Sequence, residues 1–185
     1  FSNADTFIRL GTSGTYREDI NVGDIVIAAG AVRDDGTSAE YVKTTYPALA
    51  SYDVVLALAE AAEHSSFNYH IGITRSNDSC LTGQGRPLLE YWQEEHRRIP
   101  EYWNRAGIMN FERETSTIYV LSSLMGCRAG AVNSVVNSTP KESLIPGAGK
   151  NEAVMTVLDG ISVLAEWDKK KEDLKKRYWL PSMSK

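Results

Sequence analysis

The sequence of 185 residues is poor in the side chains that mark disulfide-rich, metal-dependent or nucleophile-based proteins. Its two cysteines, Cys80 and Cys127, have no second cysteine or histidine at metal-ligand spacing. A disulfide framework is therefore excluded, and a reduced, cytoplasmic setting is expected. The three histidines, His64, His70 and His96, fit no familiar serine or cysteine nucleophile signature, so we expect surface or packing roles for them.

The sequence also lacks a strong charge bias and a long hydrophobic run. Its net charge of −4 leaves no footprint for nucleic acid, although residues 169–177 are locally basic. No apolar run approaches the roughly 20 residues that a membrane-spanning helix needs. We therefore expect neither nucleic acid nor a membrane as a partner. The composition, with 42% hydrophobic and 24% charged residues, is that of an ordinary globular domain.

Strand-like and helix-like segments alternate along the chain. The β-rich runs are residues 6–11, 24–32, 69–75 and 129–136. Helical patterns mark residues 47–64, 87–98, 100–106, 112–125 and 151–177, with Pro47 in the first helical turn and Gly126 as a C-terminal cap. This alternation predicts one α/β domain over residues 1–185, with helices on both faces of a mixed sheet.

The first and last helices are expected to bury one apolar stripe each. The first stripe is Leu49, Tyr52, Val55, Leu56, Ala59 and Ala62. The last is Val154, Val157, Leu158, Ile161 and Leu164. Residues 168–185 are largely charged, so this helix end and tail are expected to project into solvent.

The first candidate site is the segment RLGTSG, residues 9–14. Its glycines are expected to turn the backbone sharply after a strand and to expose N–H groups, beside the hydroxyls of Thr12 and Ser13. Arg9 adds a permanent positive fork that suits a phosphate or a carboxylate. The segment indicates an anion cradle; the alternative is a strand arginine paired with an acid elsewhere, next to a glycine-rich turn.

The second candidate is GIMNFERETSTIY, residues 107–119, where an extended segment gives way to a helix. Glu112 and Glu114 fall in the first helical turn, where carboxylates complement the helix dipole. A carboxylate held beside a pocket also accepts hydrogen bonds from the vicinal diol of a sugar. The sequence leaves both interpretations open.

The third candidate is TGQGRP, residues 82–87. Gln84 and Arg86 are two residues apart, so in an extended segment they would point to the same side. They could then present amide and guanidinium groups to one flat polar ligand. The alternative is a polar surface turn.

Six segments, taken in order, carry a resemblance over residues 7–164. They are FIRLGTSG, INVGDIVIAAGAVRDDG, YPALASYDVVLALAEAA, IGITRSNDSCLTGQGR, GIMNFERETSTIYVLSSLMGCRAGAV and VVNST. Each is weak alone, but their shared order and spacing are specific. Together they resemble the nucleoside phosphorylase family, most closely its uridine phosphorylases.

The resemblance implies an α/β/α sandwich with a mixed, partly barrel-like central sheet. It implies reversible phosphorolysis of a nucleoside to a free base and ribose 1-phosphate, in a homodimer or homohexamer. Inorganic phosphate would be the co-substrate, and no cofactor or metal is implied. In the family, further chain precedes the first strand and contributes to the phosphate site, so we expect an N-terminal portion before Phe1.

The resemblance also assigns roles to residues of the three candidate segments. The residues implied for phosphate are Arg9, Thr12, Ser13 and Gly14. Those implied for ribose are Glu112, Arg113 and Glu114, and those for the base are Gln84, Arg86 and Phe111. Arg9 and Glu114 would be the catalytic pair.

Three departures from the family leave the base specificity open. Arg113 stands where the family commonly has methionine, Ser138 where uridine phosphorylases have an arginine, and Cys80 where an aromatic residue faces the base. A phosphorylase of altered base specificity and a non-catalytic nucleoside or metabolite binder are therefore alternatives. Nucleoside hydrolysis is disfavoured because Arg9 and its neighbours would then have no anion to hold.

Overall fold

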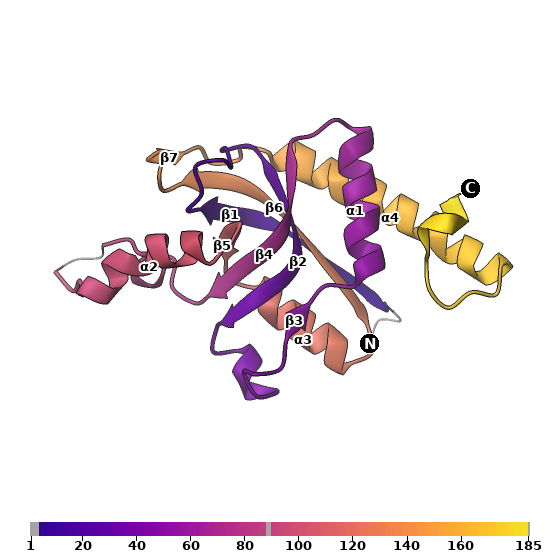
Figure 1. Ribbon diagram of the computed structural model, residues 1–185, viewed down its shortest axis with the longest axis horizontal. Coiled ribbons are helices and arrows are strands. Elements are labelled where there is room, and N and C mark those ends of the chain that lie inside the picture. Colours follow the sequence, from indigo (N-terminus) through magenta and orange to yellow (C-terminus); the bar gives the residue numbers. More distant parts are fainter. Residues whose placement is uncertain (1–3, 88–89, 185) are drawn as a thin grey trace.

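The computed structural model describes residues 4–87 and 90–184, and its centre is a seven-stranded mixed sheet (Figure 1). The strands are β1 (Thr6–Thr15), β2 (Ile25–Asp34), β3 (Ala48–Leu49), β4 (Tyr69–Asn77), β5 (Asn110–Glu112), β6 (Arg128–Ser138) and β7 (Ser143–Leu144). Their order is β3-β2-β4-β5-β1-β6-β7. A further pairing of β2 with β6 closes β2, β4, β5, β1 and β6 into a barrel. The α/β class and the mixed, barrel-like sheet expected from the sequence are confirmed.

Within the described ranges, four helices and three short 3₁₀ segments surround this sheet. The helices are α1 (Tyr52–His64), α2 (Glu94–Arg105), α3 (Thr115–Leu124) and α4 (Lys150–Asp173). The 3₁₀ segments are η1 (Ser38–Glu40), η2 (Thr82–Gln84) and η3 (Pro181–Ser184). Helices α1 and α4 pack together on one side of the sheet, and α3 covers the opposite side (Figure 1). Within the described residues, none of the helices has the length and apolarity needed to span a bilayer.

The apolar core lies between the outer wall of the barrel and these helices. Ile25 and Val132 on the strands are fully buried and pack against Val54 and Leu58 of α1. Two glycines permit the close approach: a Cβ on Gly130 of β6 would lie 2.4 Å from Val54 Cγ1, and one on Gly160 of α4 would lie 2.8 Å from Leu58 Cδ2. Because backbone meets side chain directly at both contacts, α1 is fixed between the sheet and α4.

Several predicted boundaries differ from the structure. Residues 12–15 continue β1 instead of forming a turn, because they pair with β6 as far as Thr15. Pro47 is not in a helix: β3 follows it, and α1 begins at Tyr52. The predicted helices 87–98 and 100–106 are one helix, α2, with Pro100 in its interior; residues 88–89 lie outside the described part. The cap at Gly126 is confirmed by its φ of 71°.

The predicted apolar stripes were partly wrong. On α1, Leu56 is exposed while Val54 and Leu58 are buried. On α4, Leu158 and Ile161 are exposed. Their place in the packed face is taken by small residues such as Gly160, because close helix packing selects size at the contact and not hydrophobicity alone.

The C-terminal tail does not simply project into solvent as predicted. Trp179 is only 4% exposed, and its ring stacks on Trp167 of α4 with centroids 4.5 Å apart. Met183 joins the same core cluster. Lys175, with a φ of 52°, lies directly after the end of α4, where a left-handed residue turns the chain back towards the helix.

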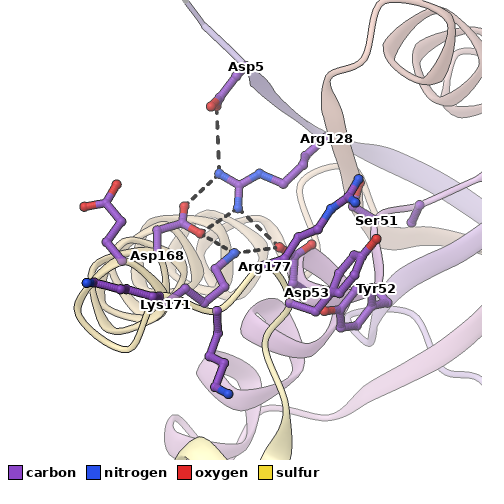
Figure 2. A pocket seen from close by; sticks show the side chains of 13 residues that line it. Asp5, Ser51, Tyr52, Asp53, Arg128, Asp168, Lys171 and Arg177 are labelled. Atoms are coloured by element: carbon purple, nitrogen blue, oxygen red, sulfur yellow. Dashed lines mark hydrogen bonds and ion pairs between the residues drawn. The ribbon is translucent and has the colours of Figure 1, made fainter.

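A charged network joins β6, α1 and α4 beside this tail, in a cavity of about 760 Å³ (Figure 2). Arg128 donates to both carboxylate oxygens of Asp168, at 2.9 and 2.7 Å, and to Asp53 at 3.2 Å. Lys171 Nζ lies 2.7 Å from Asp168 Oδ1 and 3.5 Å from Asp53 Oδ2. Burial alone would raise the pKa of Asp168, but the hydrogen bonds and charges of Arg128 and Lys171 lower it below its ordinary value.

This network predicts an acid-sensitive contribution to stability. A carboxyl whose pKa is lowered by folding stabilises the protein above its unfolded pKa of about 3.9, and this contribution is lost as the pH falls through the folded pKa. Asp168→Asn should therefore reduce the free energy of unfolding in urea at pH 7, and the difference from wild type should shrink at strongly acid pH. Asp159→Asn, on the same helix outside the network, is the control. An Asp168→Asn deficit that does not change with pH would contradict this assignment.

Candidate functional site

A second cavity, of about 260 Å³, opens where the later parts of β1, β5 and β6 meet the loop after β4. Its walls include Arg9, Thr12, Ser13, Gly14, Cys80, Gln84, Arg86, Phe111, Glu112, Arg113, Glu114, Val136, Asn137 and Leu144. The structure thus brings all of the sequence-predicted site residues to one cavity. They come from segments up to 105 positions apart, as the contact between Arg9 and Glu114 illustrates.

The Arg9 side chain is only 12% exposed and is held at three points. Its Nη1 donates to Asn133 Oδ1, its Nη2 donates to Glu114 Oε2, and its Nε lies 3.2 Å from Glu112 Oε2. Gly11 makes room for this conformation, since a Cβ there would lie 2.3 Å from Arg9 Nη1. Arg9 is therefore a strand arginine paired with acids, which is one of the two interpretations that the sequence allowed.

Glu112, at the end of β5, is a buried acceptor for several donors. Its Oε1 accepts a hydrogen bond from Ser76, and its Oε2 accepts the backbone N–H groups of Glu114 and Thr115, both at 2.9 Å. The carboxylate therefore complements the N-terminus of α3. The same Oε2 also forms an ion pair with Nε of Arg9. The prediction that Glu112 and Glu114 lie in the first helical turn was wrong, since Glu112 ends β5 and Glu114 directly precedes α3.

Glu114, directly before α3, is in a different environment from Glu112. Its side chain is 49% exposed, and it contacts Arg9 through Oε2 and Arg113 Nε, at 3.8 Å, through Oε1. Burial alone would raise its pKa, but the hydrogen bond and charge of Arg9, with the charge of Arg113, lower the pKa below its ordinary value. Glu114 is thus a charged acceptor at the mouth of the cavity, and Arg113 lies beside it.

Another part of the cavity wall contains one aromatic ring, Phe111, and the polar side chains of Gln84 and Arg86. Tyr16 stacks on Phe111 with ring centroids 4.2 Å apart, and burial raises the pKa of Tyr16 to about 12. Arg86 Cζ lies 5.7 Å from the centre of the Phe111 ring. Gln84 is 5% exposed, and its amide donates to Asn77 at 3.3 Å. A ligand with a planar polar edge fits such a surface.

Gln84 and Arg86 do not lie in an extended segment, so the alternation of side chains along a strand does not explain why they share a cavity. Thr82–Gln84 forms the 3₁₀ segment η2, and Gly85 follows with a φ of 74°, which only glycine adopts without strain. The left-handed residue redirects the chain between the two side chains. Both still reach the same cavity.

A β-bulge in the pairing of β1 with β6 determines which side chains of β6 reach the cavity. Ser13 pairs with Val135, but Gly14 pairs with Asn137, so Val136 is an extra residue. Val136 and Asn137 consequently both line the cavity. Ser138 is fully buried, with its hydroxyl unpartnered, so this position does not supply a cavity group in place of the family's arginine.

Sequence reasoning missed four polar residues of the site. Asn133 accepts a hydrogen bond from Arg9, and Ser76 donates one to Glu112. Asn137 accepts a hydrogen bond from Arg86, and Asn77 accepts one from Gln84. Asn133 and Asn137 are the two asparagines of β6, whose other residues after Arg128 are apolar or small, and an amide in such a strand is the signal that could have revealed them. Among residues 4–87 and 90–184, no group of three or more His, Cys, Asp or Glu side chains is placed to hold a metal ion.

Comparison with known proteins defines the family. Residues 2–159 match the family model described as the phosphorylase superfamily, so the chain belongs to that superfamily. It is 45% identical to the uridine phosphorylase of Thermococcus kodakarensis over 97% of this chain, and 36% identical to that of Escherichia coli over 77%. It is also 34% identical to the guanosine phosphorylase of Halorubrum lacusprofundi over 71% of this chain. The chain spans 65%, 57% and 49%, respectively, of the lengths of these relatives.

The two glutamates should differ in their importance for stability. In Glu112→Gln a neutral amide replaces a buried carboxylate that serves Ser76, Arg9 and two backbone N–H groups, so the free energy of unfolding should fall by about 2 kcal/mol. Glu114→Gln, at the half-exposed position, should cost less than about 1 kcal/mol. Urea unfolding monitored by tryptophan fluorescence measures both. Equal losses would show that the buried position has no special structural weight.

Proposed function

We propose that the protein containing this chain catalyses the reversible phosphorolysis of a pyrimidine nucleoside of the uridine type. The glycosidic C–N bond breaks, an oxygen of inorganic phosphate bonds to the anomeric carbon, and the products are a free base and ribose 1-phosphate. The observation that carries the proposal is the arrangement of one cavity: Arg9 and Glu114 meet at one end, and Phe111 with Gln84 and Arg86 forms the other. The names of the uridine phosphorylase relatives support the same reaction.

At the phosphate end, we assign the anion to Arg9 with Thr12, Ser13 and Gly14. Thr12 is exposed in the cavity wall, where its hydroxyl is available to a phosphate oxygen. Gly14 has no side chain because the Phe111 ring occupies that space: a Cβ would lie 2.4 Å from Phe111 Cζ. In this proposal Gly14 leaves room for the phosphate, and the same glycine packs against the Phe111 ring that would contact the base.

Next to the phosphate, we assign the ribose hydroxyls to Glu114, with Arg113 beside it. The lowered pKa of Glu114 keeps its carboxylate charged at neutral pH, so it can accept two hydrogen bonds from a vicinal diol. Glu112 contributes differently from a direct ligand. Its carboxylate is already engaged by protein donors, and it holds Arg9 and the backbone of Glu114 in place.

The reaction needs no protein nucleophile. As the glycosidic bond lengthens, positive charge develops on the sugar and negative charge on the departing base. Phosphate held by Arg9 attacks one face of the anomeric carbon, while Gln84 and Arg86 donate hydrogen bonds that strengthen as the base becomes anionic. The protein thus contributes position and preorganised charge, with phosphate as the co-substrate and no cofactor.

The finer features of the proposal rest on the resemblance to the family. We propose a cytoplasmic homodimer or homohexamer that acts in pyrimidine salvage. Cys80 and Arg113 line the cavity where the family has other residue types, and they favour, as a second candidate, a phosphorylase with altered base specificity. Binding without catalysis is the outcome that would replace both.

The decisive experiment is release of free base by the complete gene product from uridine, thymidine and inosine, with and without inorganic phosphate. Phosphate-dependent release of uracil is expected. Arg9→Ala should lower this turnover at least about a hundredfold because the anion loses its charged donor, while nucleoside binding persists. Arg17→Ala, which removes a cation paired with Asp19 outside the cavity, is the control. Nucleoside binding by wild type without any base release would refute the catalytic proposal.

The ion pair between Arg9 and Glu114 further predicts that the two substrates assist each other. Phosphate must compete with Glu114 for Arg9, and a ribose diol must compete with Arg9 for Glu114. Whichever ligand binds first breaks the pair, so the second binds without that cost. A carbon-linked uridine isostere, whose C–C bond resists phosphorolysis, should tighten phosphate binding about tenfold in calorimetry.

The variant Glu114→Gln tests the cause of this coupling. Because the amide cannot form the ion pair, phosphate alone should bind the variant at least as tightly as it binds wild type, and the isostere should no longer improve phosphate binding. A coupling of the same size in the variant would show that another element links the two ligands.

A further inference from the structure

Asn137 is a polar residue of the cavity to which neither the sequence nor the family resemblance gives a role. It lies on β6 and lines the cavity next to Val136. Its Oδ1 accepts a hydrogen bond of 2.6 Å from Arg86 Nη2, and its Nδ2 donates to the backbone carbonyl of Ser143 on β7 at 3.2 Å. The oxygen of the amide is therefore bonded to the guanidinium of Arg86, and its nitrogen is bonded to the neighbouring strand β7.

The bulge after Ser13 is what places Asn137 in this position. In a regular strand, successive side chains alternate between the two faces, and the extra residue of a bulge changes which face the following side chain reaches. The extra residue Val136 restarts the alternation and brings Asn137 to the same opening as Val136. Bulges are frequent beside binding sites because they redirect one side chain without breaking the sheet.

The hydrogen bond matters because Arg86 has few other restraints. It follows the left-handed Gly85 in a loop, where its backbone N–H donates to the carbonyl of Leu81, and its guanidinium lies 5.7 Å from the centre of the Phe111 ring. A guanidinium on a flexible stem loses conformational entropy when a ligand fixes it. An asparagine anchored on a rigid strand removes that loss in advance, because Arg86 is already oriented in the free protein.

We propose that Asn137 positions Arg86 over Phe111 for the departing pyrimidine base and thereby sets how well the cavity stabilises the negative charge on that base. This inference rests on the proposed phosphorolysis. It makes Asn137 a positioning residue that acts through Arg86. The neutrality of the amide is part of the role, since it orients the guanidinium without cancelling its charge.

The first test is a double-mutant cycle of Asn137→Ala and Arg86→Ala, measured as uridine affinity by calorimetry and as kcat/KM with saturating phosphate. Asn137→Ala alone should weaken uridine binding about tenfold, because a charge-assisted hydrogen bond is lost. In the Arg86→Ala background, the same change should have almost no effect, because the group that Asn137 positions is absent. Asn151→Ala, at the exposed start of α4, is the control for an asparagine outside the site.

The second test separates positioning from charge. Asn137→Asp keeps an oxygen acceptor for Arg86 but adds a negative charge beside the departing base. It should leave the KM for uridine within about threefold of wild type and lower kcat about tenfold. With 5-fluorouridine, whose base is more acidic and leaves more easily, the loss in kcat should be smaller.

The outcomes distinguish this inference from the proposed function. Uridine binding without turnover in wild type would overturn phosphorolysis alone, and the binding cycle would still decide the role of Asn137. Additive effects of Asn137→Ala and Arg86→Ala would overturn the inference and leave Asn137 as a link between β6 and β7. Equal damage from Asn137→Ala and Asn137→Asp, with the same loss for both substrates, would overturn it as well. Failure of wild type to bind uridine would overturn both.

Discussion

The arrangement of the candidate site depends on how one guanidinium is kept within the wall of a barrel. Arg9 is carried by a strand, it is nearly buried, and a cation removed from water is strongly destabilising unless acids and hydrogen-bond acceptors surround it. Glu112 and Asn133 supply fixed acceptors, and Glu114 supplies a half-exposed one. The fixed partners hold the group in place, and the exchangeable one leaves it available to an anion.

The same constraint accounts for features that are otherwise unconnected. Gly11 is needed because the guanidinium folds back over it, and Ser76 is needed to satisfy the second oxygen of Glu112. The start of α3 is set by Glu112 as well, since its carboxylate accepts two of the first N–H groups of the helix. One buried ion cluster therefore joins β1, β4, β5, β6 and α3 at the edge of the cavity.

Sequence reasoning singled out the charged members of this cluster as candidates, but the local pattern left a structural explanation open for each of them. Their roles in a site came from the resemblance to the family. Sequence reasoning also found the class of fold, since the periodicities of strands and helices are local properties. It failed where the outcome depends on tertiary contacts: residues 12–15 were read as a turn because glycine and serine are turn residues, yet pairing with β6 keeps them extended. The burial of Trp179 in the tail has the same origin, because the surface it covers belongs to a distant helix segment.

The asparagines were missed for a related reason. Their importance lies in what the two ends of each amide contact. A contact across 51 or 124 positions leaves no local pattern, as the pairs Arg86–Asn137 and Arg9–Asn133 show. In both pairs a neutral amide holds a guanidinium that the proposed reaction needs charged. Arg9 is already paired with Glu112 and Glu114, and a further carboxylate in place of either amide would cancel more of the field that a phosphate or an anionic base experiences. Among the described residues, three guanidinium groups and two carboxylates line the cavity, so these groups together carry one net positive charge. Because Asn133 and Asn137 are neutral, their hydrogen bonds to Arg9 and Arg86 leave this net positive charge unchanged. The packing of β6 is thereby linked to the chemistry proposed for the cavity.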